Sequence, residues 1–126
     1  MDSSQLHALA GRVFIATLFL ASAFGKIVNF DSTAQYMAAH GMPMVQPLCA
    51  AAILIEVAGG LSILLGFFTR WGAMLLVFYL IPTTLIFHWG PDQRIQFLKN
   101  LAIMGGLLQL AAFGGGELSL DYRAKA

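Results

Sequence analysis

Charged residues are scarce in this chain of 126 residues: they make up 10% of it, while apolar residues make up 59%. Soluble globular domains carry about 25% charged residues. So few charges cannot cover a surface that faces water, which excludes an ordinary soluble enzyme and a disordered regulator. The seven basic and six acidic residues give a net charge of +1, so no basic face is available for a nucleic acid. The composition indicates a protein whose solvent is lipid.

Cysteine is nearly absent as well. Cys49 stands alone, so the chain can form no internal disulfide and no CxxC redox pair. The three histidines, His7, His40 and His88, lack the spacing of metal ligands. We therefore expect no metal site and no cofactor that belongs to this chain alone.

Four apolar runs are each long enough to cross a bilayer, for which a helix needs about 20 mostly apolar residues. The predicted spans are residues 6–28, 48–68, 71–89 and 95–113, all approximate. They lack the alternation of barrel strands, so helices are the way to satisfy the backbone in lipid. Trp71 and Trp89 bracket the third span at a separation of about 27 Å, close to the thickness of the hydrocarbon core. We predict an all-α integral membrane four-helix bundle, a single domain over residues 1–126.

The connection between the first two spans is long enough to hold a short helix. Asp31 or Ser32 is expected to cap it, and Gly41 and Pro43 to stop it after His40. Its modest apolar stripe consists of Ala34, Met37 and Ala38. This pattern predicts an amphipathic helix that lies on the membrane surface.

The distribution of basic residues predicts the orientation. An even number of spans places both termini on one side, together with the basic residues Arg12, Arg70, Arg123 and Lys125. Near the loops of the other side, Arg94 stands alone. The positive-inside rule therefore predicts that both termini are cytoplasmic and that the short helix lies on the outer side.

Several polar residues interrupt these spans. Glu56 lies near the middle of the second span, while Lys26, His88 and Lys99 lie toward the outer ends of the first, third and fourth. A charge at mid-bilayer costs about 2.5–3.5 kcal/mol, so such residues usually face the bundle interior and have partners. Helical spacing suggests three inward rows: Cys49, Ala52, Glu56 and Gly59; Lys99, Ala102, Gly106 and Gln109; and the small residues Thr17, Ala21 and Gly25.

Each polar residue also has a purely structural explanation. Lys26 can snorkel to the interface, as can Arg12 near the cytoplasmic end. His88 can be an ordinary interfacial histidine, and Asn100 can hydrogen-bond across helices. Glu56 and Lys99 can form a structural ion pair, because buried pairs are weak evidence of function.

If Glu56, Lys26 and Lys99 converge, two cations and one anion leave a local charge of +1. Such a pocket favours a small anion or the carbonyl oxygens of a quinone. We expect Glu56 to accept protons or pair with a lysine, with His88 as a second proton-transfer group. Lys26, Lys99 and Asn100 are the candidate substrate- or quinone-binding residues.

At these positions the chain resembles the DoxX family of small bacterial membrane proteins. The matching pieces run through nearly the whole chain: Ser22 to Lys26, Phe30, Tyr36-Met37, Gly41-Met42-Pro43, Glu56 to Gly60, Gly66-Phe67-Phe68-Thr69-Arg70, Phe87-His88, Lys99-Asn100-Leu101, Gly105-Gly106 and Leu118-Ser119-Leu120-Asp121. The resemblance implies a four-helix protein of the bacterial inner membrane. Some members of the family resemble the small subunit of a thiosulfate:quinone oxidoreductase, and others are associated with redox complexes.

Three functions follow as hypotheses. The first is a redox-linked subunit that binds a quinone or a small anionic substrate in the outer half of the bundle. It would be an oxidoreductase component if it is an enzyme, with a membrane or periplasmic redox protein as partner. The second is a membrane scaffold or assembly partner without a ligand. The third is a small proton-coupled carrier. The small size of the bundle also makes a homo-oligomer plausible in the lipid bilayer.

Overall fold

The computed structural model describes residues 3–88 and 90–125. Within these ranges the elements are α1 (Ser3–Val28), α2 (Phe30–Ala39), α3 (Val45–Leu65), α4 (Thr69–Phe87), the 3-10 turn η1 (Pro91–Gln93), α5 (Arg94–Phe113) and α6 (Leu120–Lys125). The described residues contain no strand. Helices α1, α3, α4 and α5 are long and apolar enough to cross a membrane, which confirms the predicted all-α bundle with a short helix between its first two spans. Trp89, the second of the two tryptophans expected to bracket the third span, lies outside the described residues.

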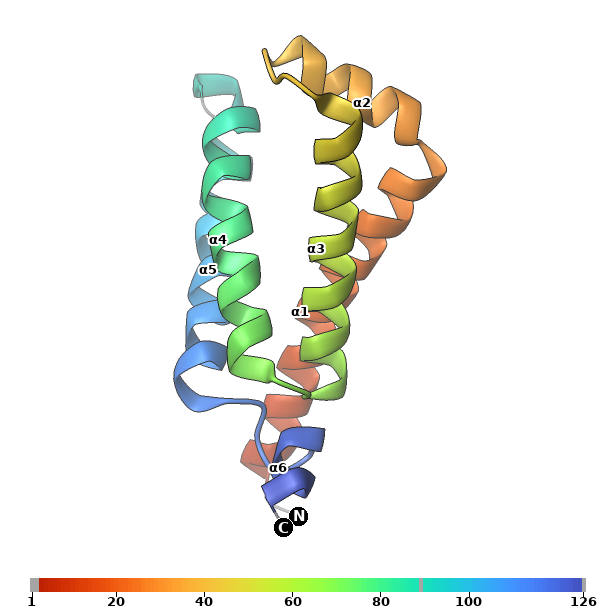
Figure 1. Ribbon diagram of the computed structural model, residues 1–126. Helices are drawn as coiled ribbons and strands as arrows, with labels where there is room; N and C mark the ends of the chain where they lie inside the picture. Colours follow the sequence, from red (N-terminus) through yellow and green to blue (C-terminus); the bar gives the residue numbers. More distant parts are fainter. Residues whose placement is uncertain (1–2, 89, 126) are drawn as a thin grey trace.

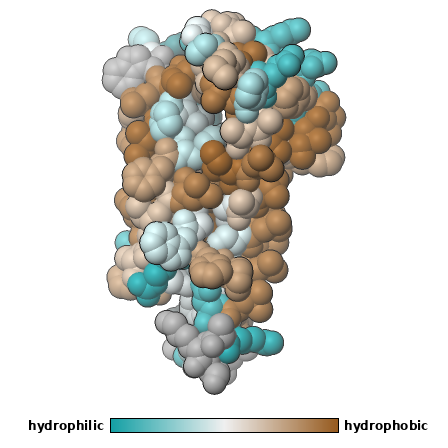
Figure 2. Space-filling model, viewed as in Figure 1, coloured by the Kyte–Doolittle hydropathy of each residue, from teal (hydrophilic) through white to brown (hydrophobic). Residues whose placement is uncertain are grey.

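The four long helices form a chain of neighbours. Helix α1 packs on α3, α3 on α4, and α4 on α5, while the short α2 packs mainly on α3. Figure 1 shows α3 and α4 in front, α2 across one end of the bundle, and α6 beside the start of α1 at the other end. We call the end with α2 the distal end and the end with α6 the terminal end. The middle of the molecule is brown in Figure 2, and the teal atoms gather toward the two ends, as expected for a membrane-spanning body.

Close packing of α3 on its neighbours depends on glycine. A Cβ added at Gly59 would lie 2.5 Å from Cγ of Leu76 on α4, and one added at Gly60 would lie 2.9 Å from Cδ2 of Leu20 on α1. A side chain at either position would require a leucine on the neighbouring helix to move. Because membrane helices gain no hydrophobic driving force from one another, this close approach supplies much of their attraction.

The boundaries of the long helices differ from the approximate prediction by up to three residues. Helix α3 runs from Val45 to Leu65, three residues earlier than expected, and its end is set by Gly66, which adopts a left-handed backbone with φ of 69°. Helix α2 begins at Phe30, so neither Asp31 nor Ser32 is its cap. The N-cap is Asn29, whose N–H and side-chain amide both donate to the carbonyl of Gly25, 3.0 Å and 3.2 Å away. These bonds tie the start of α2 to the end of α1.

Arg12 does not snorkel, and this prediction is wrong. The residue is only 1% exposed. Its guanidinium donates to the carbonyls of Ile63 at 3.0 Å and Leu64 at 3.3 Å, and also to the carbonyl of Leu118. Arg12 thus supplies donors to the last turn of α3, where helix carbonyls lack partners and a positive charge is favoured.

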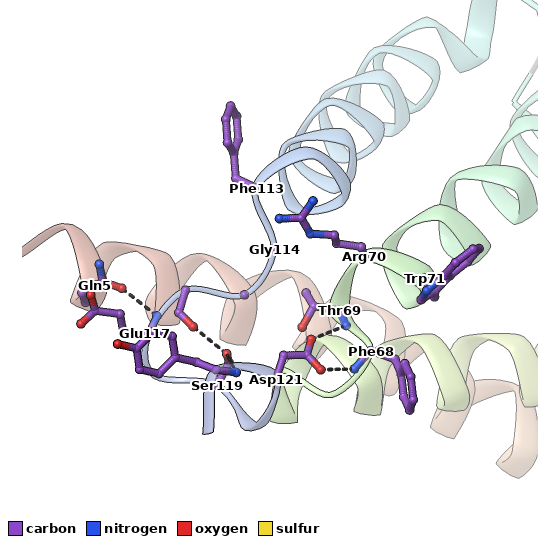
Figure 3. A pocket seen from close by; sticks show the side chains of 13 residues that line it. Gln5, Phe68, Thr69, Arg70, Trp71, Phe113, Gly114, Glu117, Ser119 and Asp121 are labelled. Carbon is purple, nitrogen blue, oxygen red and sulfur yellow. Dashed lines mark hydrogen bonds between the residues drawn. The ribbon is translucent and has the colours of Figure 1, made fainter. Parts of the chain in front are cut away.

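The tail after α5 folds back onto the turn between α3 and α4. The carboxylate of Asp121 accepts the backbone N–H groups of Phe68 at 2.7 Å and Thr69 at 2.8 Å, which Figure 3 shows from close by. The Asp121 N–H donates to the carbonyl of Gly66 at 2.8 Å. We refer to Arg12, Gly66, Phe68, Leu118 and Asp121 together as the terminal clamp. It joins α1, α3, α4 and the tail through polar contacts.

Candidate functional site

An ion pair lies inside the distal half of the bundle. Nζ of Lys26 on α1 is 2.8 Å from Oε1 of Glu56 on α3, and the two side chains are 22% and 4% exposed. Nζ also donates a hydrogen bond to Oγ of Ser22, at 2.8 Å. The structure therefore brings together two of the residues that the sequence predicted to converge.

The lysine side chain runs toward the middle of the bundle. Lys26 lies near the distal end of α1, where the ammonium group could reach water. It instead contacts Ser22, one turn deeper on the same helix, and Glu56, near the middle of α3. Lys26 therefore does not snorkel to the interface. The hydrogen bond to Ser22 uses one of the three ammonium protons, so beside the ion pair with Glu56 the group keeps a donor for another molecule.

A cavity of about 640 Å³ opens beside this pair. Its walls come from the distal ends of α1, α3 and α4 and from α2. Apolar side chains form most of the lining, including Met37, Leu48, Ala52, Ile55 and Ile86. The polar groups on the walls include Lys26, Tyr79, Thr83 and His88. A mostly apolar cavity of this size with a few polar groups is the usual form of a small-molecule site.

Aromatic rings lie at the distal end of the cavity. Tyr36 of α2 stacks on Phe87 of α4 with ring centroids 5.5 Å apart, and both residues line the cavity. His40 packs edge-on against Phe87, with ring centroids 4.9 Å apart, and in a tilted arrangement against Tyr36, at 4.5 Å. These three rings connect α2 to the end of α4.

His88 lies on the cavity wall, at the end of α4. Its Nδ1 is 3.1 Å from Oε1 of Gln93, just before α5. The structure thus places Lys26 and His88 on the walls of one cavity, with Glu56 behind Lys26. Whether His88 transfers protons stays a prediction.

The expected convergence of Lys99 with this pair is wrong. Lys99 is exposed on α5 and does not line the cavity. The inward side of α5 includes Asn100 and Leu107, so the expected row through Ala102, Gly106 and Gln109 is displaced by one residue, which is a rotation of about 100°. Without Lys99 the local charge is zero rather than +1. On α1 the inward row is likewise Arg12, Ala16, Phe19 and Ala23, and not Thr17, Ala21 and Gly25.

Asn100 joins two helices. It is 5% exposed, and its Nδ2 donates to Oγ1 of Thr84 on α4 at 3.0 Å. It does not line the cavity. The geometry supports the alternative in which Asn100 is a structural bond between helices, and we do not retain it as a ligand-binding residue.

Sequence reasoning missed several residues at the site. Tyr36, Tyr79 and Thr83 line the cavity but were not predicted as site residues. One signal was available, because Tyr79, Thr83 and Ile86 recur at helical spacing around Pro82 and so share one face of α4. The contribution of α2 had no such signal, since it depends on how that helix folds over the bundle.

A second cavity, of about 510 Å³, lies at the terminal end. Figure 3 shows its lining, with Arg70 and Phe113 above the clamp residue Asp121. None of the predicted site residues lines it. In the described part of the chain no group of three or more histidine, cysteine or acidic residues could hold a metal ion, and Cys49 is buried.

Comparison with known proteins identifies the family. The sequence profile of DoxX matches residues 7–89. The chain belongs to the DoxX family. It is 40% identical to the inner membrane protein YphA of Escherichia coli, covering 91% of this chain and 88% of that protein, and 39% identical to the inner membrane protein YqjF of the same organism, covering 93% and 91%. The ER-derived vesicles protein ERV29 of Saccharomyces cerevisiae is 25% identical over 92% of this chain but only 33% of its own length. No solved structure matches.

This DoxX protein is a small, multi-pass inner-membrane protein, as its spans and its inner-membrane relatives indicate together. Sequence pieces that first suggested the family meet in space. Ser22 and Lys26 meet Glu56 at the ion pair. The stretch Gly66 to Arg70 meets the ending Leu118 to Asp121 at the terminal clamp.

Proposed function

We propose that this DoxX-family protein binds a quinone in the distal cavity, as the ligand-binding membrane subunit of a redox system. The observation that carries the proposal is the position of the Lys26 ammonium group. It is drawn inward to Glu56 and lies on the wall of a cavity of about 640 Å³. That volume falls within the range of about 300–1,000 Å³ typical of small-molecule sites.

The chemistry of the walls supports a neutral, carbonyl-bearing ring over a free anion. Lys26 and Glu56 form a neutral pair, and Lys99 contributes no second cation. The remaining ammonium donor of Lys26 suits a carbonyl oxygen. The rings of Tyr36 and Phe87 offer aromatic surface at the distal end, where offset stacking against a ligand ring is favourable.

Each residue then has a defined role. Lys26 donates a hydrogen bond to the ligand carbonyl, and Glu56 holds the ammonium group in place and can exchange a proton with it. His88 is the second proton-carrying group on the wall. Reduction of a quinone takes up protons together with electrons, and in this proposal a membrane or periplasmic redox protein supplies the electrons.

Quinone binding to the purified protein in lipid nanodiscs tests the proposal. The variants are Lys26→Met, the double variant Lys26→Met/Glu56→Gln, and Lys99→Met as a matched control from the same end of the bundle. The double variant removes the ammonium donor without leaving a lone buried carboxylate, which by itself is strongly destabilising. Thermal unfolding of each variant separates loss of binding from loss of folding.

Binding by the wild type and the Lys99→Met variant, with loss in the folded double variant, is the expected result. If the folded double variant binds as well as the wild type, Lys26 is not the ligand donor and the proposal fails. If the wild type binds no quinone, a scaffold role or a proton-coupled carrier is favoured instead. Uptake into proteoliposomes then distinguishes those two.

A further inference from the structure

The two front walls of the distal cavity separate toward α2. Near their shared turn, α3 and α4 are held in contact by Gly59 against Leu76. Figure 1 shows the two helices close together at that end and farther apart toward α2. The cavity fills the space between the separated halves, with Lys26 of α1 behind it.

The rim of this opening is apolar on both sides. Leu48 and Ala51 border it on α3, and Pro82 and Ile86 border it on α4. Leu48 and Ile86 are each 40% exposed, although both line the cavity. We call these four residues the α3–α4 seam. Their apolar side chains suit contact with lipid tails, whereas an opening to water would normally have a polar rim.

Ring contacts between the α2 segment and α4 lie at the other end of the cavity. They are the stacking of Tyr36 on Phe87 and the edge-on contact of His40 with Phe87. Helix α2, which carries Tyr36 and is capped by His40, is itself packed on α3. The α2 end of the cavity is thus bridged by ring contacts, whereas the seam is lined by aliphatic side chains that reach the surface.

We infer that the ligand reaches the cavity from the bilayer through the α3–α4 seam, and that it carries an aliphatic tail which stays between α3 and α4 while its polar ring reaches Lys26. This inference rests on the proposed function and narrows the ligand class to lipid-soluble, tail-bearing quinones. A water-soluble ring without a tail occupies the part of the cavity next to Lys26 but leaves the seam empty. The tail adds contact with the seam and keeps the ligand in the membrane when it dissociates.

Photolabelling tests the route. The probe is a benzoquinone whose long alkyl tail ends in a diazirine, applied to the protein in nanodiscs, with a tail-less benzoquinone as competitor. The labelled residues are located by mass spectrometry. The matched variants are Ala51→Trp, which fills the seam, and Ala50→Trp, which places the same side chain on the neighbouring exposed position outside the cavity.

We expect the probe to label α3 and α4 at the seam and the competitor to reduce this labelling. Ala51→Trp should reduce the labelling about tenfold, a factor typical of a 1–3 kcal/mol overpacking penalty. Ala50→Trp should leave it unchanged. Competable labelling on α2, or equal labelling in both tryptophan variants, overturns the seam route while the cavity still binds its ligand. Labelling that no competitor reduces shows that the cavity binds no quinone, and the proposed function fails with it.

Discussion

Replacement of Arg12 by methionine is expected to destabilise the protein strongly. The guanidinium of Arg12 donates to the carbonyls of Ile63, Leu64 and Leu118, and Arg12 is almost completely buried. Each hydrogen bond to a charged group contributes about 1.5–3 kcal/mol. Methionine fills a similar volume but removes the guanidinium donors from these carbonyls, of which Ile63 keeps the N–H of Gly66. Because the contributions overlap, we expect a total loss of about 3–5 kcal/mol, the usual cost of removing one partner from a buried polar cluster.

The chain carries a built-in reporter for this measurement. Cys49 is its one cysteine and is fully buried, so a thiol-reactive fluorescent dye reacts only when the helices separate. For a protein of this size the expected loss corresponds to a decrease in Tm of about 10 °C or more. Arg70→Met is the matched control, because Arg70 is an exposed arginine at the same end. Its expected change in Tm is within about 2 °C, as for most surface substitutions.

Two outcomes would refute the reasoning. A Tm of the Arg12→Met variant equal to that of the wild type would show that the terminal clamp contributes nothing to stability. An equal decrease in the Arg70→Met variant would show that the effect comes from positive charge at this end of the membrane and not from the buried contacts.

Two further predictions follow from the packing and the charges. Gly59→Ala should lower Tm relative to Gly105→Ala, because an added Cβ meets Leu76 at Gly59 and nothing within 4 Å at Gly105. Overpacking of this kind costs about 1–3 kcal/mol. Equal Tm values in the two variants would contradict the prediction. Both termini are predicted to be cytoplasmic, so a green fluorescent protein fused after α6 should fluoresce and an alkaline phosphatase fused there should be inactive, whereas active phosphatase would reverse the orientation.

The sequence was sufficient for the fold because lipid imposes a simple rule on it. Long apolar runs must be helices, so the four spans and the short α2 followed from composition and from stop signals such as Gly41 and Pro43. The inward row through Cys49, Ala52, Glu56 and Gly59 was also correct. A charged Glu56 is so costly in lipid that it could be assigned to the inward face of its helix with no knowledge of the neighbouring helices.

The pairing of charges was only partly predictable. Lys26 and Lys99 are both lysines near the distal end, but a shift of one residue on α5 turns Asn100 inward and leaves Lys99 exposed. A long, flexible lysine near a helix end can reach water from almost any face, so its presence in the span does not fix its direction. The rotation of α5 is set by its contacts with α4, including the bond between Asn100 and Thr84.

The terminal clamp could not be predicted from local patterns. Arg12 and Leu118 are far apart in the sequence and meet only because the tail folds back after α5. Asp121 lies in a segment after the last span that carries no motif of its own, yet its carboxylate accepts hydrogen bonds from the backbone at the start of α4. Contacts of this kind depend on the path of the whole chain, which no single span encodes.

The most direct test of the central claim compares two lysines. Quinone affinity should fall about tenfold or more in the folded Lys26→Met/Glu56→Gln variant, as expected for the loss of a hydrogen bond from a charged donor, and should be unchanged in Lys99→Met. Equal affinity in the wild type and the folded double variant, or an equal loss in Lys99→Met, would contradict the assignment of Lys26 as the ligand donor in the distal cavity.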